Sequence, residues 1–109
     1  MIRLICSDVD NTLVQEGSKD INPEYFEAIC KLRAKGIQVA IASGRPESSI
    51  SSLFKPIEEK LFFIAAGGAM ISTCNRQLFV WELPEEAWKK MIVQVRQIPT
   101  MEVQVNGTK

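Results

Sequence analysis

The chain has 109 residues, of which 46% are hydrophobic and 24% are charged, and its 13 basic and 13 acidic residues give a net charge of zero. This composition is typical of one globular domain and argues against a nucleic-acid partner, which would favour a basic excess. The chain contains no histidine. That absence excludes histidine general bases, Ser-His and Cys-His pairs, and most zinc sites.

The cysteines and the N-terminus indicate the compartment. Cys6, Cys30 and Cys74 are widely spaced and form no C-x-x-C motif, as expected for free thiols in a reducing cytosol. The N-terminus leads directly into a strand-like segment without a signal-peptide pattern. No apolar stretch approaches the roughly 20 residues of a membrane span. We therefore expect a cytoplasmic protein with no membrane partner.

The chain begins with an almost continuous apolar run over residues 2–7, which predicts a strand buried on both faces. A polar loop containing glycine is expected over residues 13–21. Asn22-Pro23-Glu24 then predicts a helix start, with Asn at the N-cap and Pro at the first helical position. Apolar residues follow at helical spacing, and Gly36 is the expected C-terminal cap.

Two further strands are predicted over residues 37–42 and 61–65, with a helix opened by Pro46 between them. Strand, helix, strand, helix, strand predicts two right-handed βαβ units and a parallel sheet. Because the carboxyl ends of parallel strands meet at one edge of a sheet, Asp8, Ser43 and Gly67 should converge there.

After residue 68 the pattern changes. Residues 69–72 and 78–82 predict a hairpin, Pro84 begins an amphipathic helix that Pro99 ends, and residues 101–105 alternate like a half-buried strand. The predicted fold class is α/β. We expect part of a Rossmann-like parallel three-layer sandwich over residues 1–68, followed by the start of an α+β cap over residues 69–109.

The first candidate site is the pair Asp8 and Asp10 at the end of the first strand. Two close carboxylates repel each other, so both ionise only beside a cation or hydrogen-bond donors. A hard divalent ion such as Mg²⁺ suits such oxygens. An EF-hand loop is excluded, because Leu13 occupies its glycine position and Lys19 its glutamate position. An Asp-Asn turn that only ends the strand remains an alternative.

The second candidate site is Ala42-Ser43-Gly44-Arg45, at the end of the second strand. A serine hydroxyl and the backbone N–H groups before a helix can bind a phosphoryl oxygen. The alternative is that Ser43 only caps the helix. Neither the G-x-x-x-x-G-K-[ST] motif nor the G-x-G-x-x-G motif occurs, so nucleotide P-loops and dinucleotide folds are not supported.

Three segments together resemble the haloacid dehalogenase-like hydrolases. The segment "DVDNTLV" at 8–14 resembles their first signature, D-x-D-x-T, and "VAIASGRP" at 39–46 resembles their second. The segment "FIAAGGAMI" at 63–71 is similar to the third-strand segment of the Cof-type branch, where Asn-Gly-Ala is usual. Their order and spacing agree with the family, so the resemblance covers the whole chain.

The resemblance implies a Mg²⁺-dependent phosphatase acting on a small phosphorylated metabolite such as a sugar phosphate. Asp8 would be the nucleophile that forms an aspartyl-phosphate, and Asp10 would be the general acid and then the general base. The Asp8 carboxylate and the Asp10 backbone carbonyl would hold Mg²⁺. Thr12 would help to hold the loop, and Thr12, Ser43 and Gly44 would form the phosphate-binding site.

Departures from the family pattern qualify this interpretation. Asn11 replaces the usual glycine, a mild change because Asn tolerates left-handed backbone. The family's later signature lysine and acidic residues have no counterpart, and Lys109 lacks the matching context. We therefore expect residues 1–109 to be weakly active or inactive alone, because the chemistry depends on electrostatics around the phosphoryl group.

The resemblance also bears on association. The family's first strand is central, whereas here strand 2–7 would have a bare edge, which favours self-association. A non-catalytic, truncated module of the same family that binds phosphate, metal or a partner remains the alternative. A phospho-acceptor receiver domain fits less well, because no acidic cluster precedes a later acceptor aspartate.

Overall fold

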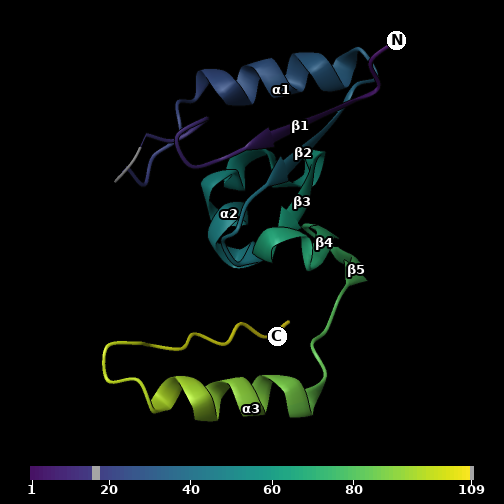
Figure 1. The fold of residues 1–109 in the computed structure, drawn as a ribbon. Coiled ribbons are helices and arrows are strands. Elements are labelled where there is room, and N and C mark those ends of the chain that lie inside the picture. The colour runs from purple at the N-terminus through teal and green to yellow at the C-terminus, as the bar shows by residue number, and fades with distance from the viewer. Residues whose placement is uncertain (16–17, 109) are drawn as a thin grey trace.

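The computed structural model describes residues 1–15 and 18–108 (Figure 1). One five-stranded sheet with the order β1-β2-β3-β4-β5 organises the fold. The first three strands run parallel to one another. The fourth strand pairs antiparallel with the third, and the fifth pairs antiparallel with the fourth. The two predicted βαβ units and the α/β, Rossmann-like class are thereby confirmed. The strands are β1 (Leu4–Asp8), β2 (Gln38–Ala42), β3 (Leu61–Ala65), β4 (Met70–Thr73) and β5 (Arg76–Val80).

The helices begin and end close to the predicted positions. They are α1 (Glu24–Ala34), α2 (Glu47–Leu53) and α3 (Glu85–Arg96), with 3₁₀ segments at Lys55–Lys60 (η1) and Ala66–Gly68 (η2). Oδ1 of Asn22 accepts a hydrogen bond from the backbone N–H of Glu24 at 3.0 Å, as expected of a helix-capping side chain. Pro46 is at the cap position of α2 rather than inside the helix.

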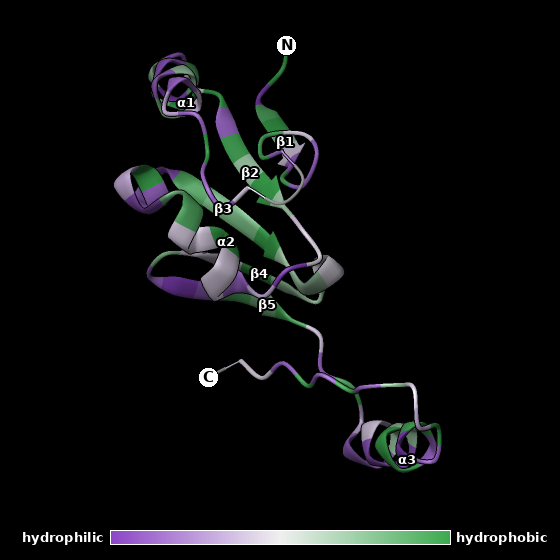
Figure 2. Ribbon diagram, turned by 90° about the vertical axis from the view of Figure 1, so that its left-hand side faces the viewer, coloured by the Kyte–Doolittle hydropathy of each residue, from purple (hydrophilic) through white to green (hydrophobic). Residues whose placement is uncertain are grey.

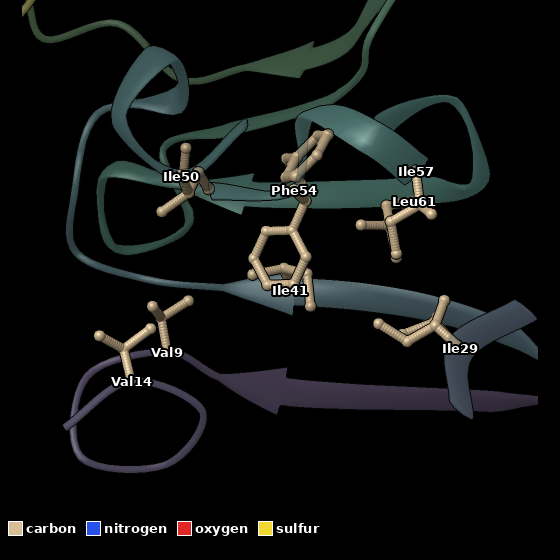
Figure 3. Packing of buried hydrophobic residues seen from close by; sticks show 11 residues of the cluster. Val9, Val14, Ile29, Ile41, Ile50, Phe54, Ile57 and Leu61 are labelled. Carbon is tan, nitrogen blue, oxygen red and sulfur yellow. The ribbon is translucent and has the colours of Figure 1, made fainter. Parts of the chain in front are cut away.

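One face of the sheet carries the core. Val39, Ile41 and Phe63 lie on this face, and burial along β3 alternates residue by residue. α1 connects β1 to β2, and α2 connects β2 to β3, the next strand on the same side. Because such crossovers are right-handed, both helices lie on the same face of the sheet (Figure 2). The packed cluster between sheet and helices is drawn in Figure 3. It contains Val9, Val14, Ile29, Val39, Ile41, Ile50, Phe54, Ile57, Leu61, Phe63 and Ala65.

The expectation that the first strand is buried on both faces is wrong for the described residues. β1 pairs with β2 alone among them, and its residues alternate between exposed and half-buried. Leu4 is 57% exposed. An edge strand covered on one side buries only every second side chain, whatever the hydrophobicity of the others.

The C-terminal segment differs from its prediction in one element. The hairpin and α3 form as expected, but residues 101–105 are not a strand. Alternation favours a strand only where a neighbouring strand pairs with it, and this segment has none among the described residues. α3 lies apart from the sheet in both views, and none of its residues is buried (Figures 1 and 2).

The predicted division of the chain at residue 68 stays a prediction, because β4 and β5 extend the same sheet as β1–β3.

Within residues 1–15 and 18–108, no helix has the length and apolar character needed to cross a bilayer.

Candidate active site

The loop after β1 is organised around Val9, which is fully buried. Its carbonyl oxygen accepts hydrogen bonds from three backbone N–H groups, those of Thr12, Leu13 and Val14, at 3.2, 2.9 and 3.0 Å. The N–H of Asn11 donates to the carbonyl of Val14 at 2.8 Å. The chain therefore curls tightly while Val9 and Val14 anchor it in the core (Figure 3).

Asn11, which stands where the family usually has glycine, takes a left-handed backbone conformation. Its φ is 61°, in a region that few residues other than glycine adopt without strain. This turn directs the chain back on itself, so that Asp8 and Asp10 stay at the carboxyl edge of the sheet. Both aspartates are exposed there.

Asp8 and Thr12 face each other across this loop. Oγ1 of Thr12 donates a hydrogen bond to Oδ2 of Asp8 at 3.1 Å. The donated bond orients the carboxylate and stabilises its charge. Oδ1 of Asp8 accepts no hydrogen bond from the described side chains and remains available for chemistry.

Asp10 forms an ion pair with Arg45, which lies 35 residues later in the chain. Nε of Arg45 donates to Oδ2 of Asp10 at 3.0 Å, and Nη2 donates to Oδ1. This is the two-pronged geometry that matches a guanidinium to a carboxylate. The hydrogen bond with Asp10 raises the pKa of Arg45 above its ordinary value.

Ser43 lies at the end of β2 and is 8% exposed. Its Oγ accepts a hydrogen bond from the backbone N–H of Arg45 at 3.1 Å. Because α2 begins only at Glu47, Ser43 does not cap that helix. A hydroxyl that accepts one bond can still donate its proton to a ligand. The neighbouring Gly44 is exposed, and a Cβ added there would meet no atom within 4 Å.

The turn after β3 holds the Ser43–Arg45 loop from the other side. The N–H of Ala66 donates to the carbonyl of Arg45 at 2.9 Å, and the N–H of Gly67 donates to the carbonyl of Ser43 at 3.1 Å. Asp8 lies opposite Ala42 in the register of β1 and β2. The predicted convergence of Asp8, Ser43 and Gly67 at one edge of the sheet is thus confirmed.

The oxygen donors at this edge fit part of a magnesium site. The Asp8 carboxylate and the Asp10 backbone carbonyl are hard oxygen ligands on one short loop, of the kind that Mg²⁺ uses together with water and substrate phosphate. The Asp10 carboxylate is held by Arg45 and is therefore not counted as a ligand. Among the described residues, no group of three or more His, Cys, Asp or Glu residues that could hold a metal ion occurs.

Sequence reasoning missed the side-chain role of Arg45. It treated the two aspartates as lacking any residue that balances their charge, whereas Arg45 balances Asp10. The signal available in the sequence was the position of Arg45, a cationic residue shortly after β2, the strand that pairs in parallel with β1. Lys109, which lacks the sequence context of the family's signature lysine, lies outside the described residues.

Comparison with known proteins decides the family. A family model described as haloacid dehalogenase-like hydrolase matches residues 5–108. The chain belongs to this family. The resemblance of the three sequence segments is thereby confirmed.

Individual relatives give the same result. The chain is 28% identical over 103 residues to the 5-amino-6-(5-phospho-D-ribitylamino)uracil phosphatase YbjI of Escherichia coli, covering 94% of this chain and 38% of that protein. A crystal structure from Eubacterium rectale matches with a TM-score of 0.81 and 43% identity, covering 87% of this chain and 36% of that one. The chain thus spans well under half of the length of these two relatives.

The branch within the family is indicated by a further solved structure. A sugar phosphatase of haloacid dehalogenase subclass IIB, BT4131, matches with a TM-score of 0.67 and 25% identity, covering 87% of this chain and 37% of that one. This neighbour agrees with the Cof-type resemblance of the β3 segment.

Proposed function

We propose that the protein is a Mg²⁺-dependent phosphatase that hydrolyses phosphate monoesters of small metabolites through an aspartyl-phosphate on Asp8. The arrangement of Asp8 and Thr12 carries this proposal. Thr12 holds one carboxylate oxygen of Asp8 at 3.1 Å, while the other oxygen is available at an exposed strand end. A nucleophile needs this combination of fixed orientation and access.

In the first step, Oδ1 of Asp8 attacks phosphorus and the bond from phosphorus to the ester oxygen breaks. Asp10, in its protonated form, donates its proton to the departing oxygen. In the second step, the Asp10 carboxylate takes a proton from water, and this water attacks the phosphorus of the aspartyl-phosphate. The bond to Asp8 breaks, inorganic phosphate leaves, and both aspartates return to their initial states.

Phosphate binding is assigned to Ser43 and Gly44. The expected contribution of Thr12 is limited to holding the loop, because its hydroxyl proton goes to Asp8 and its N–H goes to the carbonyl of Val9. The Ser43 hydroxyl proton and the exposed backbone around Gly44 offer donors beside Asp8. The metal, when bound by the Asp8 carboxylate and the Asp10 carbonyl, supplies positive charge that offsets the charge of the phosphoryl group.

The names of two relatives support the proposed substrate class. The Escherichia coli relative and the subclass IIB neighbour carry names of phosphatases with small phosphorylated substrates.

Three further properties belong to this proposal. Residues 1–109 alone are weakly active or inactive, because one guanidinium balances two aspartates and the phosphoryl dianion. They self-associate through the exposed edge of β1. The protein works in the cytoplasm, in keeping with three free cysteines.

The test uses the full-length gene product, an aryl phosphate and Mg²⁺. The wild type should release inorganic phosphate, chelation of Mg²⁺ should stop the reaction, and Asp8→Asn should lower kcat by at least about a thousandfold. Asp20→Asn is the matched control, because Asp20 is an exposed aspartate in the loop before α1 and lies outside the proposed machinery. An Asp8→Asn protein that turns over normally rules out the aspartyl-phosphate.

A trapping experiment separates catalysis from mere binding. Beryllium fluoride mimics a phosphoryl group on a carboxylate, and it should bind the wild type with Mg²⁺ but not Asp8→Asn. Binding of inorganic phosphate without trapping or turnover favours the alternative, a non-catalytic module that binds phosphate.

A further inference from the structure

Both oxygens of the Asp10 carboxylate are occupied by one guanidinium. Nε of Arg45 reaches Oδ2 at 3.0 Å, and Nη2 reaches Oδ1. The Asp10 side chain is 51% exposed and the Arg45 side chain is 32% exposed. An aspartate on an exposed loop would otherwise be free to change rotamer, so the ion pair with Arg45 determines its orientation.

The backbone of Arg45 is itself fixed on both sides. Its N–H donates to Oγ of Ser43 at 3.1 Å, and its carbonyl accepts from the N–H of Ala66 at 2.9 Å. Pro46 follows with φ held near −57°. The guanidinium therefore extends from a backbone that two neighbouring strand ends hold in place.

The two nitrogens that contact Asp10 form one edge of the guanidinium plane. Because this edge is used, it is not available for a phosphate group, which Arg also prefers to bind through two parallel hydrogen bonds. A lysine ammonium retains the charge but cannot fix the plane of a carboxylate.

We propose that Arg45 is a positioning residue that orients the Asp10 carboxylate for its proton transfers. This inference rests on the proposed function, since it assigns a role relative to the acid and base of that reaction. Misplacement of a reacting group by about 1 Å can lower a rate by about a hundredfold. The loss of Arg45 should therefore affect turnover rather than affinity.

The test compares Arg45→Lys and Arg45→Gln in the full-length protein, with an aryl phosphate as substrate and inorganic phosphate as inhibitor. Both variants should lower kcat roughly 10- to 100-fold and leave KM and the inhibition constant of phosphate within about twofold. Failure of lysine to restore kcat identifies the planar guanidinium as the requirement. Arg33→Lys, in the last turn of α1, is the matched control and should match the wild type.

A double substitution gives the sharper readout. If Arg45 acts only through Asp10, adding Arg45→Gln to Asp10→Asn should lower kcat by less than about twofold further. Losses that multiply overturn the inference, as does a rise of about tenfold in the phosphate inhibition constant with kcat unchanged. Thermal unfolding identifies any variant that fails to fold, and Arg45→Lys then replaces Arg45→Gln in the double substitution.

The failures of the two proposals are distinguishable. An active wild type whose Arg45 variants keep full kcat overturns the positioning role alone. A wild type that hydrolyses no phosphate ester overturns the proposed function and the positioning role together.

Discussion

The hydroxyl of Thr12 donates a hydrogen bond to Oδ2 of Asp8 across 3.1 Å. This contact joins the proposed nucleophile to the fourth residue after it, in a loop shaped by the three hydrogen bonds that the carbonyl of Val9 accepts. One buried carbonyl thus shapes the loop that holds the Asp8 carboxylate.

Replacing Thr12 by valine tests this contact. Valine keeps the branched shape but has no hydroxyl, so the carboxylate of Asp8 loses its donor. We expect kcat/KM to fall about tenfold, the size of effect of one hydrogen bond to a charged group. Thr12→Ser retains the hydroxyl and should stay within about threefold of the wild type. Equal losses for both variants would contradict a role for the hydroxyl.

Ser43→Ala addresses phosphate binding. The hydroxyl of Ser43 accepts from the N–H of Arg45 and has a proton left to donate, so its removal should weaken the binding of inorganic phosphate about tenfold. Isothermal titration with phosphate in the presence of Mg²⁺ measures this effect. Ser48, which is exposed in α2, supplies the control Ser48→Ala. Unchanged phosphate affinity in Ser43→Ala would remove Ser43 from the binding site.

The turn at Ala66–Gly68 predicts opposite effects for two similar substitutions. Ala66 has φ of 50° and Gly67 has φ of 66°, a region that costs a residue with a Cβ about 1–2 kcal/mol. Ala66→Gly should therefore raise the free energy of unfolding by about 0.5 kcal/mol, after the cost of glycine flexibility in the unfolded chain. Gly67→Ala should lower it by about 0.5–1 kcal/mol, because the reduced flexibility of the unfolded chain offsets part of the strain. Urea unfolding of both variants checks the signs.

The core depends on Phe54, which is fully buried between Phe26 and Phe63, with ring centroids 6.1 and 6.5 Å away. Phe54→Ala should lower the free energy of unfolding by about 3–5 kcal/mol. Phe79 on β5 is 46% exposed, and Phe79→Ala should cost less than about 1 kcal/mol. Similar losses at both positions would contradict the assigned position of the core.

The edge of β1 predicts the solution state of residues 1–109. Because β1 has an unpaired edge among the described residues and Leu4 is 57% exposed, light scattering should detect association that increases with concentration. Leu4→Lys should reduce it. Met91→Lys is the control, since Met91 is equally exposed but lies on α3. A monodisperse monomer at all concentrations would contradict the proposed self-association.

Much of the fold could be predicted because local patterns and parallel topology determine it. β3 begins and ends where its apolar run does, and the convergence of Asp8 with Ser43 follows from the register of neighbouring parallel strands. The burial of β1 could not be predicted, because it depends on which strands pair beside it. The absence of a strand at 101–105 has the same origin.

The site was predicted as a set of residues but not as a set of contacts. The order of aspartate, aspartate and threonine in the loop indicated chemistry, and the structure places these residues together. The ion pair of Arg45 with Asp10 was missed because side-chain direction in a loop depends on hydrogen bonds from elsewhere, here from Ser43 and Ala66. Sequence spacing does not encode such tertiary supports.

The turn at Ala66–Gly68 has two attachments. On one side its N–H groups hold the carbonyls of Ser43 and Arg45; on the other it leads into β4, and the carbonyl of the next residue, Ala69, accepts from the N–H of Trp81 at 2.7 Å. Hydrogen bonds of this one turn thus connect the segment before α3 with the loop that carries Arg45, the ion-pair partner of Asp10. Two hydrogen bonds therefore connect the hairpin to the loop after β2, one through the carbonyl of Arg45 and one through the carbonyl of Ser43.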